Sequence, residues 1–514
     1  MHNLNKIVSR GAGALCLSGL ALLAASPVLA QATDKSITIV VQSEPDTLDG
    51  CQAARSATGT IIMENVVETL DERDSNTGEL KPRLATSWEQ INDKTWRFHL
   101  RTGVKFHDGA DWNAAAAVKS INRAMTESLS CEVRLKLFSG LKITATAVDD
   151  ATLDISADKP VPIMPVQVAA LPFTSPNTPD DKIVATPIGT GPYKLAKWDA
   201  GQEIDLARND AYWGDKPAVD GARYVWRGES SVRASMVQLG EADIAPTIAA
   251  QDATDAGMDK SYLNSETTYL RIDTLTPPLN DVRVRLALNY AFDRNSVLGS
   301  MMPKDALNAT QIVVPAIPGH NPELDKEVRA YDPDKAKQLL AEAKADGVPV
   351  DTEIVLQARP AVYPNSMDLA QAIVAMYQAV GLNIRIDTID EATSRKVSNK
   401  PFKDGREPAL LQATSDNNQG DPVFQASFKY GCEGAQSQLC DPAADALAAD
   451  ASATPAGSAR VQKWQQFFTQ LYEKDVPEVW MYHMVAYARV GSRVNFTPSL
   501  TTNGQLQLAQ VSFK

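Results

Sequence analysis

Histidines and glycine-rich turns are the first places to look for catalytic or metal chemistry in this chain. Beyond residue 30 there are four histidines, His99, His107, His320 and His483, and none stands in an H-E-x-x-H pattern. Neither a G-x-S-x-G elbow nor a phosphate-binding P-loop occurs. The run 189–192 (GTGP) is a weak likeness of a P-loop, because its proline lacks an amide donor that a phosphate cradle needs. The sequence therefore argues against an enzyme, and so few histidines give little support to nickel, which normally takes imidazole ligands.

Four cysteines also lie beyond residue 30, and an even number in an oxidising compartment favours disulfides. Cys432 and Cys440 are eight positions apart around Gly434, which suits a small closed loop, and Cys51–Cys131 then follows by elimination. Free buried thiols are the alternative. Zinc is disfavoured, because there is no C-x-x-C spacing and no histidine close to these cysteines in sequence.

The first thirty residues have the pattern of a secretory signal peptide. Lys6 and Arg10 give a positive start, an apolar run follows over 11–23, and residues 28–30 (VLA) suit a signal peptidase. A membrane anchor is the alternative, but the apolar run is short for a bilayer. We expect cleavage after Ala30 and a soluble periplasmic protein.

Length and charge narrow the function classes further. The chain has 514 residues and a formal net charge of −13, which becomes −15 when Lys6 and Arg10 are removed. A strongly acidic surface repels nucleic acid and anionic lipid. About 480 residues exceed one typical domain, so two or more lobes are expected. We expect no cofactor, no nucleic-acid partner and a monomer.

Hydrophobic periodicity and turn residues predict alternating strands and helices, and therefore an α/β fold with a mixed or parallel sheet. A strand is predicted at 383–387 after a helix that ends at Gly381. The Pro-rich stretch 160–179 is interpreted as a surface excursion. The other predicted strands are 37–41, 95–100 and 505–513, and the other predicted helices are 114–125, 333–346 and 460–474.

Six segments, in the same order along the chain, resemble the peptide and nickel type of extracellular solute-binding protein (family 5) that serves ABC importers. They are 80–89 (LKPRLATSWE), 98–109 (FHLRTGVKFHDG), 187–193 (PIGTGPY), 208–214 (RNDAYWG), 281–294 (DVRVRLALNYAFDR) and 331–336 (YDPDKA). The family usually has an acidic residue where Ala117 stands here. In physical terms the motifs are structural, since Gly189 and Gly191 permit tight or left-handed turns that a Cβ would strain.

The resemblance implies a two-lobed periplasmic binding protein, similar to the periplasmic dipeptide-binding protein, whose lobes close over a ligand in the cleft between them. It implies lobe I over 31–270, with an extra subdomain at about 70–200, lobe II over 271–485, and a return to lobe I over 486–514. The expected function is capture of a small peptide or amino-acid-derived solute for delivery to an ABC importer permease. An opine-like or sugar conjugate or an oligosaccharide is the alternative ligand, and nickel or haem is a more distant one.

The resemblance also points to ligand contacts. The segment 357–365 is similar to one in which an Arg before Pro binds the ligand carboxylate, so Arg359 takes that role here, with Tyr363 beside it. In the family an Asp shortly before "DP" binds the ligand amine, and in this chain the position falls on Asp416 or on Asn418, depending on the register. Asn417 is a further candidate, and with Asn418 and Gln419 it suits hydroxyl groups.

Overall fold

An eleven-stranded mixed sheet runs through the chain in the computed structural model, which describes residues 35–74, 78–138, 140–360, 362–363, 365–418, 420–502 and 504–514. The strands follow the order β15-β14-β16-β12-β17-β11-β1-β10-β9-β8, and β13 pairs with β17 off this path. Their bounds are β1 (Ser36–Val41), β8 (Tyr193–Asp199), β9 (Glu203–Arg208), β10 (Gly221–Trp226), β11 (Ile244–Ile248), β12 (Asp259–Ile272), β13 (Leu307–Asn308), β14 (Ile354–Ala358), β15 (Ile384–Thr388), β16 (Ala409–Asp416) and β17 (Glu478–Val490). The α/β class and the mixed sheet that the sequence predicts are confirmed.

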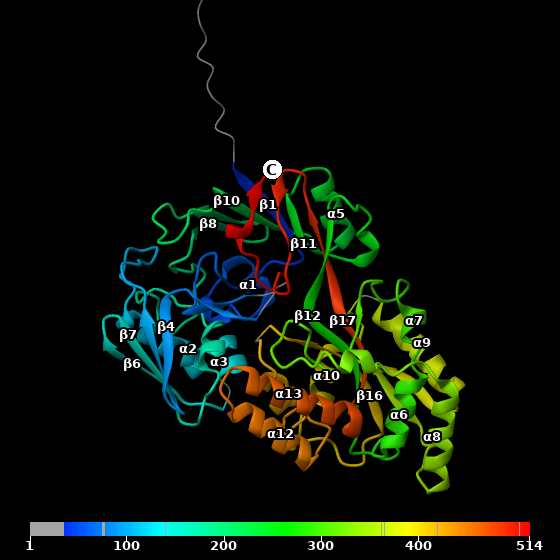
Figure 1. Cartoon of the computed structure of the whole chain (residues 1–514). Helices are drawn as coiled ribbons and strands as arrows, with labels where there is room; N and C mark the ends of the chain where they lie inside the picture. The colour runs from blue at the N-terminus through cyan, green and yellow to red at the C-terminus, as the bar shows by residue number, and fades with distance from the viewer. Residues whose placement is uncertain are drawn as a thin grey trace, which may run out of the picture. The chain divides into compact units, whose positions relative to one another are not determined.

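The two longest strands, β12 and β17, cross from one half of the sheet to the other as an antiparallel pair (Figure 1). On one side β17 pairs with β11. On the other side β12 pairs with β16 from Glu266 onward, and β17 pairs with β13 at His483. The register between β12 and β17 shifts between Leu263 and Thr267, where the partners change. A local irregularity of this kind bends and twists a strand.

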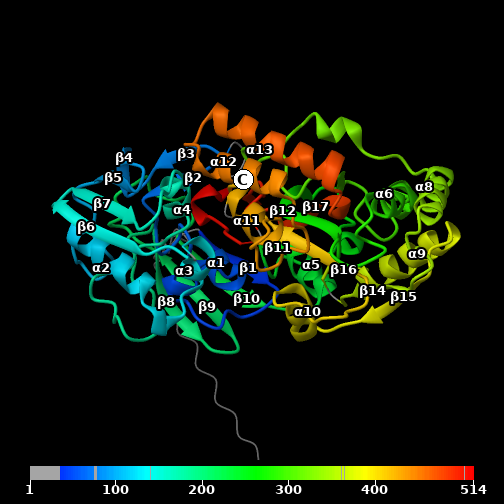
Figure 2. The same cartoon turned by 90° about the horizontal axis from the view of Figure 1, so that it is seen from below.

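A separate four-stranded sheet, in the order β4-β5-β7-β6, lies beside α2 (Figure 2). Its strands are β4 (Ala85–Asn92), β5 (Thr95–Leu100), β6 (Ile143–Asp149) and β7 (Thr152–Ala157), and α2 is Ala114–Met125. Helix α2 begins where the side chain of Asn113 accepts the Ala116 N–H. Phe98, Leu153 and Ile121 are buried in the core between sheet and helix.

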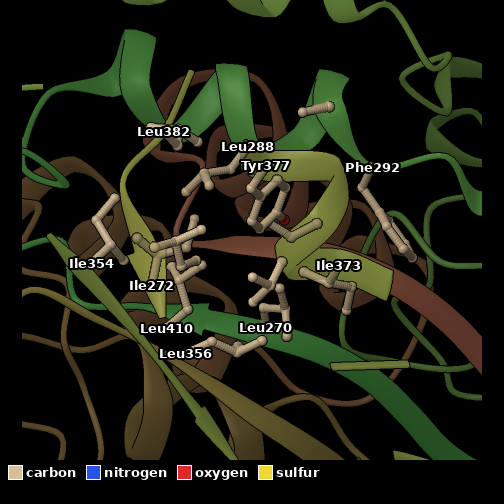
Figure 3. Close-up of a cluster of buried hydrophobic side chains, with 14 of the residues drawn as sticks. Leu270, Ile272, Leu288, Phe292, Ile354, Leu356, Ile373, Tyr377, Leu382 and Leu410 are labelled. Carbon is tan, nitrogen blue, oxygen red and sulfur yellow. The ribbon is translucent and has the colours of Figure 1, made fainter. Parts of the chain in front are cut away.

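The half that contains β14, β15 and β16 is covered by α6 (Val282–Ala291), α8 (Pro333–Ala345) and α9 (Ser366–Ala379). Its core packs side chains of these helices against the sheet (Figure 3). The largest contributors include Leu270, Leu288, Phe292, Leu356, Ile373, Tyr377 and Leu410. Burying such side chains stabilises the fold by about 1.5–3 kcal/mol each.

Two more helices, α12 (Pro442–Ala453) and α13 (Ser458–Gln470), pack together over a second core in this half. The remaining elements are short. They are α1 (Ser56–Ile62), α3 (Glu132–Leu137), α4 (Met164–Val168), α5 (Ser230–Gln238), α7 (Arg294–Val297), α10 (Glu391–Ser398), α11 (Val423–Lys429), β2 (Asp71–Arg73), β3 (Leu80–Pro82), β18 (Val494–Asn495) and β19 (Ser512–Phe513), with single helical turns at Gly50–Gln52, Glu127–Leu129, Ala250–Asp252, Leu324–Glu327, Leu471–Asp475 and Leu508–Gln510.

Both cysteine pairs are bonded as the sequence favours, Cys51 to Cys131 and Cys432 to Cys440. Within the described part of the chain, no helix is both long and apolar enough to cross a membrane. The expected signal peptide and its cleavage site lie outside the described residues, and the expected lobe boundaries stay a prediction.

Two predictions from the sequence are wrong. The stretch 160–179 is not a surface excursion, because Met164, Val168 and Phe173 are buried in the core against the four-stranded sheet. The stretch 505–513 forms strand only at Ser512–Phe513. The side chain of Asn65 explains the second error, since it donates to the Leu506 carbonyl and accepts the Leu508 N–H, replacing a partner strand.

Candidate ligand-binding site

Arg359 stands directly after β14 and is held by the neighbouring strand β16. Its backbone N–H donates to the Gln412 Oε1 (3.1 Å), and its Nη1 lies 3.5 Å from the Gln412 carbonyl oxygen. Gln412 is fully buried, and its Nε2 donates to the Tyr363 hydroxyl (3.0 Å) and to the Ser366 carbonyl (2.8 Å). Burial raises the pKa of Tyr363. One buried amide therefore fixes both Arg359 and Tyr363 relative to the sheet.

Asp416 is the last residue of β16, where its carboxylate sits beside a second one. Asp416 Oδ1 accepts the Asn418 N–H (2.9 Å), which closes a turn at the end of the strand. Glu266 of β12 is its partner in the strand register. Burial, and then the charge of Asp416, raise the pKa of Glu266 to about 7. The two side chains form a carboxylate pair that carries less than two full charges near neutral pH.

Asn417 and Asn418 have different surroundings from those of Asp416. Asn417 is buried, and its Nδ2 donates to the carbonyls of Ser265 (2.9 Å) and Ile312 (3.2 Å). Asn417 therefore ties the end of β16 to β12. The Asn418 carbonyl accepts from Arg73 (2.9 Å), a residue of β2 beside the four-stranded sheet. Ligand contacts from these two asparagines stay predictions, and Gln419 lies outside the described residues.

Arg359 and Asp416 lie at the same edge of the sheet, which is the one formed by the carboxyl ends of β14 and β16. Strands β14 and β16 are parallel, with Gln357 opposite Leu411. Continuing this register puts Arg359 beside Ala413, three residues before Asp416, or about 10 Å along the strand at roughly 3.3 Å per residue. Ligands of open α/β sheets bind outside the carboxyl ends of the strands. A positive and a negative group thus stand at the edge where a ligand is expected.

A buried charge cluster beneath this edge escaped the sequence reasoning. Lys429 of α11 donates to the Tyr269 hydroxyl of β12 (2.6 Å). Burial lowers the pKa of Lys429 to about 8 against the opposing effect of Glu478, and the positive charges of Arg271 and Arg359 lower it further. Burial likewise raises the pKa of Glu478 to about 8. Arg359 therefore belongs to a group of interacting charges and is not an isolated loop residue.

A cleft of about 1080 Å³ opens next to this edge. Part of its lining comes from the end of β11 and from β12, including Asn264 and Glu266, and another part comes from residues 299–305, 360, 362–363 and 365–368. Tyr363 contributes to the wall beside Arg359. The volume is at the upper end of what small-molecule sites offer, so a peptide-sized ligand fits.

Comparisons with known proteins show the family and the fold. The family of bacterial extracellular solute-binding proteins, family 5 Middle, matches residues 79–436. The dipeptide-binding protein of Escherichia coli K12 is 28% identical over 456 residues, covering 81% of this chain and 83% of that protein.

Solved structures share the fold. HbpA2 from Haemophilus parasuis superposes with a TM-score of 0.80 at 22% identity, covering 93% of this chain and 100% of the other. The ABC transporter-associated periplasmic binding protein DppA from Helicobacter pylori, in complex with the peptide STSA, superposes with a TM-score of 0.73 at 20% identity, covering 93% and 98%. The two-lobed fold expected from the sequence is confirmed.

Proposed function

The chain belongs to family 5 of the bacterial extracellular solute-binding proteins, which serve ABC importers, and we propose that it captures a small peptide or amino-acid-derived solute in the periplasm for its permease. The observation that carries the proposal is the placement of Arg359 and Asp416 at one sheet edge, where their neighbours Pro360 and Glu266 line a cleft of about 1080 Å³. The similar dipeptide-binding protein and the peptide complex of the Helicobacter pylori protein support this ligand class.

The charges at the edge suit a zwitterion. Each charge of a free peptide costs several kcal/mol to bury without a partner. A guanidinium binds a carboxylate bidentately, so Arg359 receives the carboxylate end. Asp416, with Glu266 beside it, receives the ammonium. A separation of about 10 Å, from the strand rise, leaves room for a short peptide between them.

Closure of the two halves completes the site in this proposal. Lobe I comprises residues 31–270 and 486–514, lobe II comprises residues 271–485, and β12 and β17 carry the movement between them. Contacts from both halves then favour the closed form, so ligand shifts the population toward it. Export through a signal peptide cleaved after Ala30 would bring the protein to the periplasm, and the N-terminal residue of the mature protein would be Gln31.

Two substitutions test the ligand assignment. Arg359→Ala should weaken binding by about 2–5 kcal/mol, roughly thirtyfold to several-thousandfold, because it leaves a buried carboxylate unpaired. Arg385→Ala is the matched control, since Arg385 is a partly exposed residue of β15 paired with Glu353 and Glu407. The measurement is calorimetric titration with the ligand that mass spectrometry identifies after mild purification. Unchanged affinity in Arg359→Ala would show that the carboxylate role is wrong.

The second substitution, Asp416→Asn, separates ligand classes. A ligand with a free ammonium should bind much more weakly, because the charge that pairs with it is gone. A neutral sugar conjugate should lose little, because an amide still bonds to hydroxyl groups. Asp387→Asn on β15 is the control, since Asp387 is an exposed carboxylate of the same sheet. A full loss with a neutral ligand would contradict this division of roles.

A further inference from the structure

Two of the four histidines that looked sparse in the sequence meet in space. One ligand atom each from His320, His483 and Asp325 lies within 4.8 Å of the others. The two imidazole centres are 5.8 Å apart, and His320 Nε2 is 3.5 Å from Asp325 Oδ1. Two imidazoles and one carboxylate form a donor set that suits divalent transition metals.

Separate elements position the three side chains. His483 lies in the middle of β17 between β12 and β13, opposite Thr267 and Leu307. Its Nδ1 forms a hydrogen bond with the Thr267 hydroxyl (2.9 Å), which fixes the ring and leaves Nε2 for another partner. His320 is held from α13, since its carbonyl accepts from Gln465 (2.9 Å).

The third side chain, Asp325, comes from the helical turn Leu324–Glu327. Its Oδ1 accepts from the Thr310 hydroxyl (3.1 Å), so this carboxylate too is oriented by a neighbour. Its side chain is 35% exposed, whereas those of the two histidines are buried. Asp325 thus stands at the solvent side of the cluster, where an ion would enter.

The buried nitrogens point to a ligand. Nε2 of His320 and Nε2 of His483 are both buried, and neither has a hydrogen-bond partner among the described residues. His483 is 1% exposed, so leaving this nitrogen unpaired costs about 1–3 kcal/mol. A plain His320–Asp325 ion pair does not account for His483.

We propose that His320, His483 and Asp325 bind one divalent transition-metal ion of the zinc class. Metal–nitrogen distances of about 2.0–2.1 Å require the three donor atoms to draw closer together. Side-chain rotations within the cluster would have to supply this movement. The ion would fasten the turn that carries Asp325 and the loop that carries His320 to the crossing strand β17. None of His320, Asp325 and His483 is among the residues that line the 1080 Å³ cleft.

Zinc titration of the mature chain, prepared without a polyhistidine tag and stripped with chelator, tests the proposal. Calorimetry should show one Zn²⁺ per chain, and Co²⁺ should give visible absorption bands of a nitrogen- and oxygen-ligated ion. His320→Ala should lower zinc affinity at least about a hundredfold, since losing a residue that only orients a ligand already costs roughly 10- to 100-fold. His99→Ala is the control, because His99 is an exposed histidine next to Glu89.

Asp325→Asn keeps the test decisive if His320→Ala does not fold, because Asp325 is at the surface of the cluster. Zinc should raise the melting temperature of the wild type clearly and that of Asp325→Asn much less. The proposal is overturned if the wild type binds no Zn²⁺ with a dissociation constant below about 0.1 mM, about −5.5 kcal/mol. It is also overturned if His99→Ala removes the binding, or if His320→Ala and Asp325→Asn both bind like the wild type.

Discussion

Asp421 and Arg460 form a buried ion pair close to the proposed solute site. Replacing one partner measures how much burial adds to the cost of breaking an ion pair. Asp421 follows the turn at Asn418, and Arg460 belongs to α13. Arg460 Nε and Nη2 bond the two carboxylate oxygens of Asp421 at 3.0 and 2.7 Å. The two side chains are 4% and 7% exposed. We predict that Asp421→Asn, which keeps the shape and removes the charge, lowers the free energy of unfolding by about 3 kcal/mol.

The magnitude follows from what Arg460 keeps and what it loses. Breaking one side of a buried ion pair costs about 3–5 kcal/mol, because the other charge stays buried without compensation. Arg460 Nη1 retains three backbone acceptors at the end of α12, the carbonyls of Ala451 (2.6 Å), Ser452 (3.0 Å) and Thr454 (2.8 Å). These bonds still solvate the guanidinium, so we expect the lower end of the range.

The control is a pair with the same geometry and more water around it. Arg97 Nε and Nη2 bond the two oxygens of Asp154 at 2.8 and 2.9 Å, with side chains 31% and 18% exposed. Asp154→Asn should cost about 0–1 kcal/mol, as exposed pairs do. Urea unfolding of both variants, with the m-value checked for constancy, gives the comparison. Equal losses for the two substitutions would refute the claim that burial decides the cost.

Three other predictions concern the site and the hinge. The pKa of Glu266 in the folded protein is about 7, above its ordinary value of 4.5. Between these two values the folded state binds more protons than the unfolded state, so the contribution of Glu266 to the free energy of unfolding falls as pH rises from 4.5 through 7. Over pH 6 to 7 the affinity for an ammonium ligand should instead rise, by about fivefold, because Glu266 ionises, and a flat profile in the wild type, or a slope that survives in Glu266→Gln, would contradict the role of this carboxylate. Gly191→Ala should destabilise the protein by about 1–3 kcal/mol in urea unfolding, since a Cβ would meet the Asn65 carbonyl, and wild-type stability would show that the backbones can separate. Ligand should reduce the radius of gyration in small-angle scattering, and an unchanged radius in a demonstrably open starting form would argue against closure.

Local patterns predicted helices and strands well where residues adjacent in the sequence decide the conformation. The helix predicted at 114–125 is found at those residues, and its cap Asn113 is visible in the sequence. The strand predicted at 383–387 appears one residue later, as β15. Gly189 and Gly191 matter for a different reason from the one expected, because both have ordinary backbone angles and are required by the close approach of the Asn65–Val67 backbone.

Contacts between residues far apart in the sequence could not be predicted from local patterns. Lys429 and Tyr269 bond across 160 positions, and nothing in either local segment indicates the other. His320 and His483 likewise meet only in the folded chain, where α13 holds His320 and the sheet holds His483. The buried segment at Met164 looked like a loop because the stretch is rich in prolines, yet its apolar side chains fill a core. Whether such a segment is buried depends on residues that are distant in sequence, so the segment alone does not predict it.

The central place of β1 in the sheet has a consequence for how the chain folds. Ser36 pairs with Gly221, Ile39 pairs with Ile244, and Ile244 in turn pairs with Val490. The part of the sheet around β1 therefore cannot be completed until almost the whole chain is available. In contrast, a continuous middle stretch of the chain contains all of α6, α8, α9 and the strands β14 to β16. Long-range pairing of this kind slows folding and leaves unpaired strand edges exposed meanwhile. The middle stretch should acquire hydrogen-exchange protection first during refolding, and β1 should acquire it together with β17.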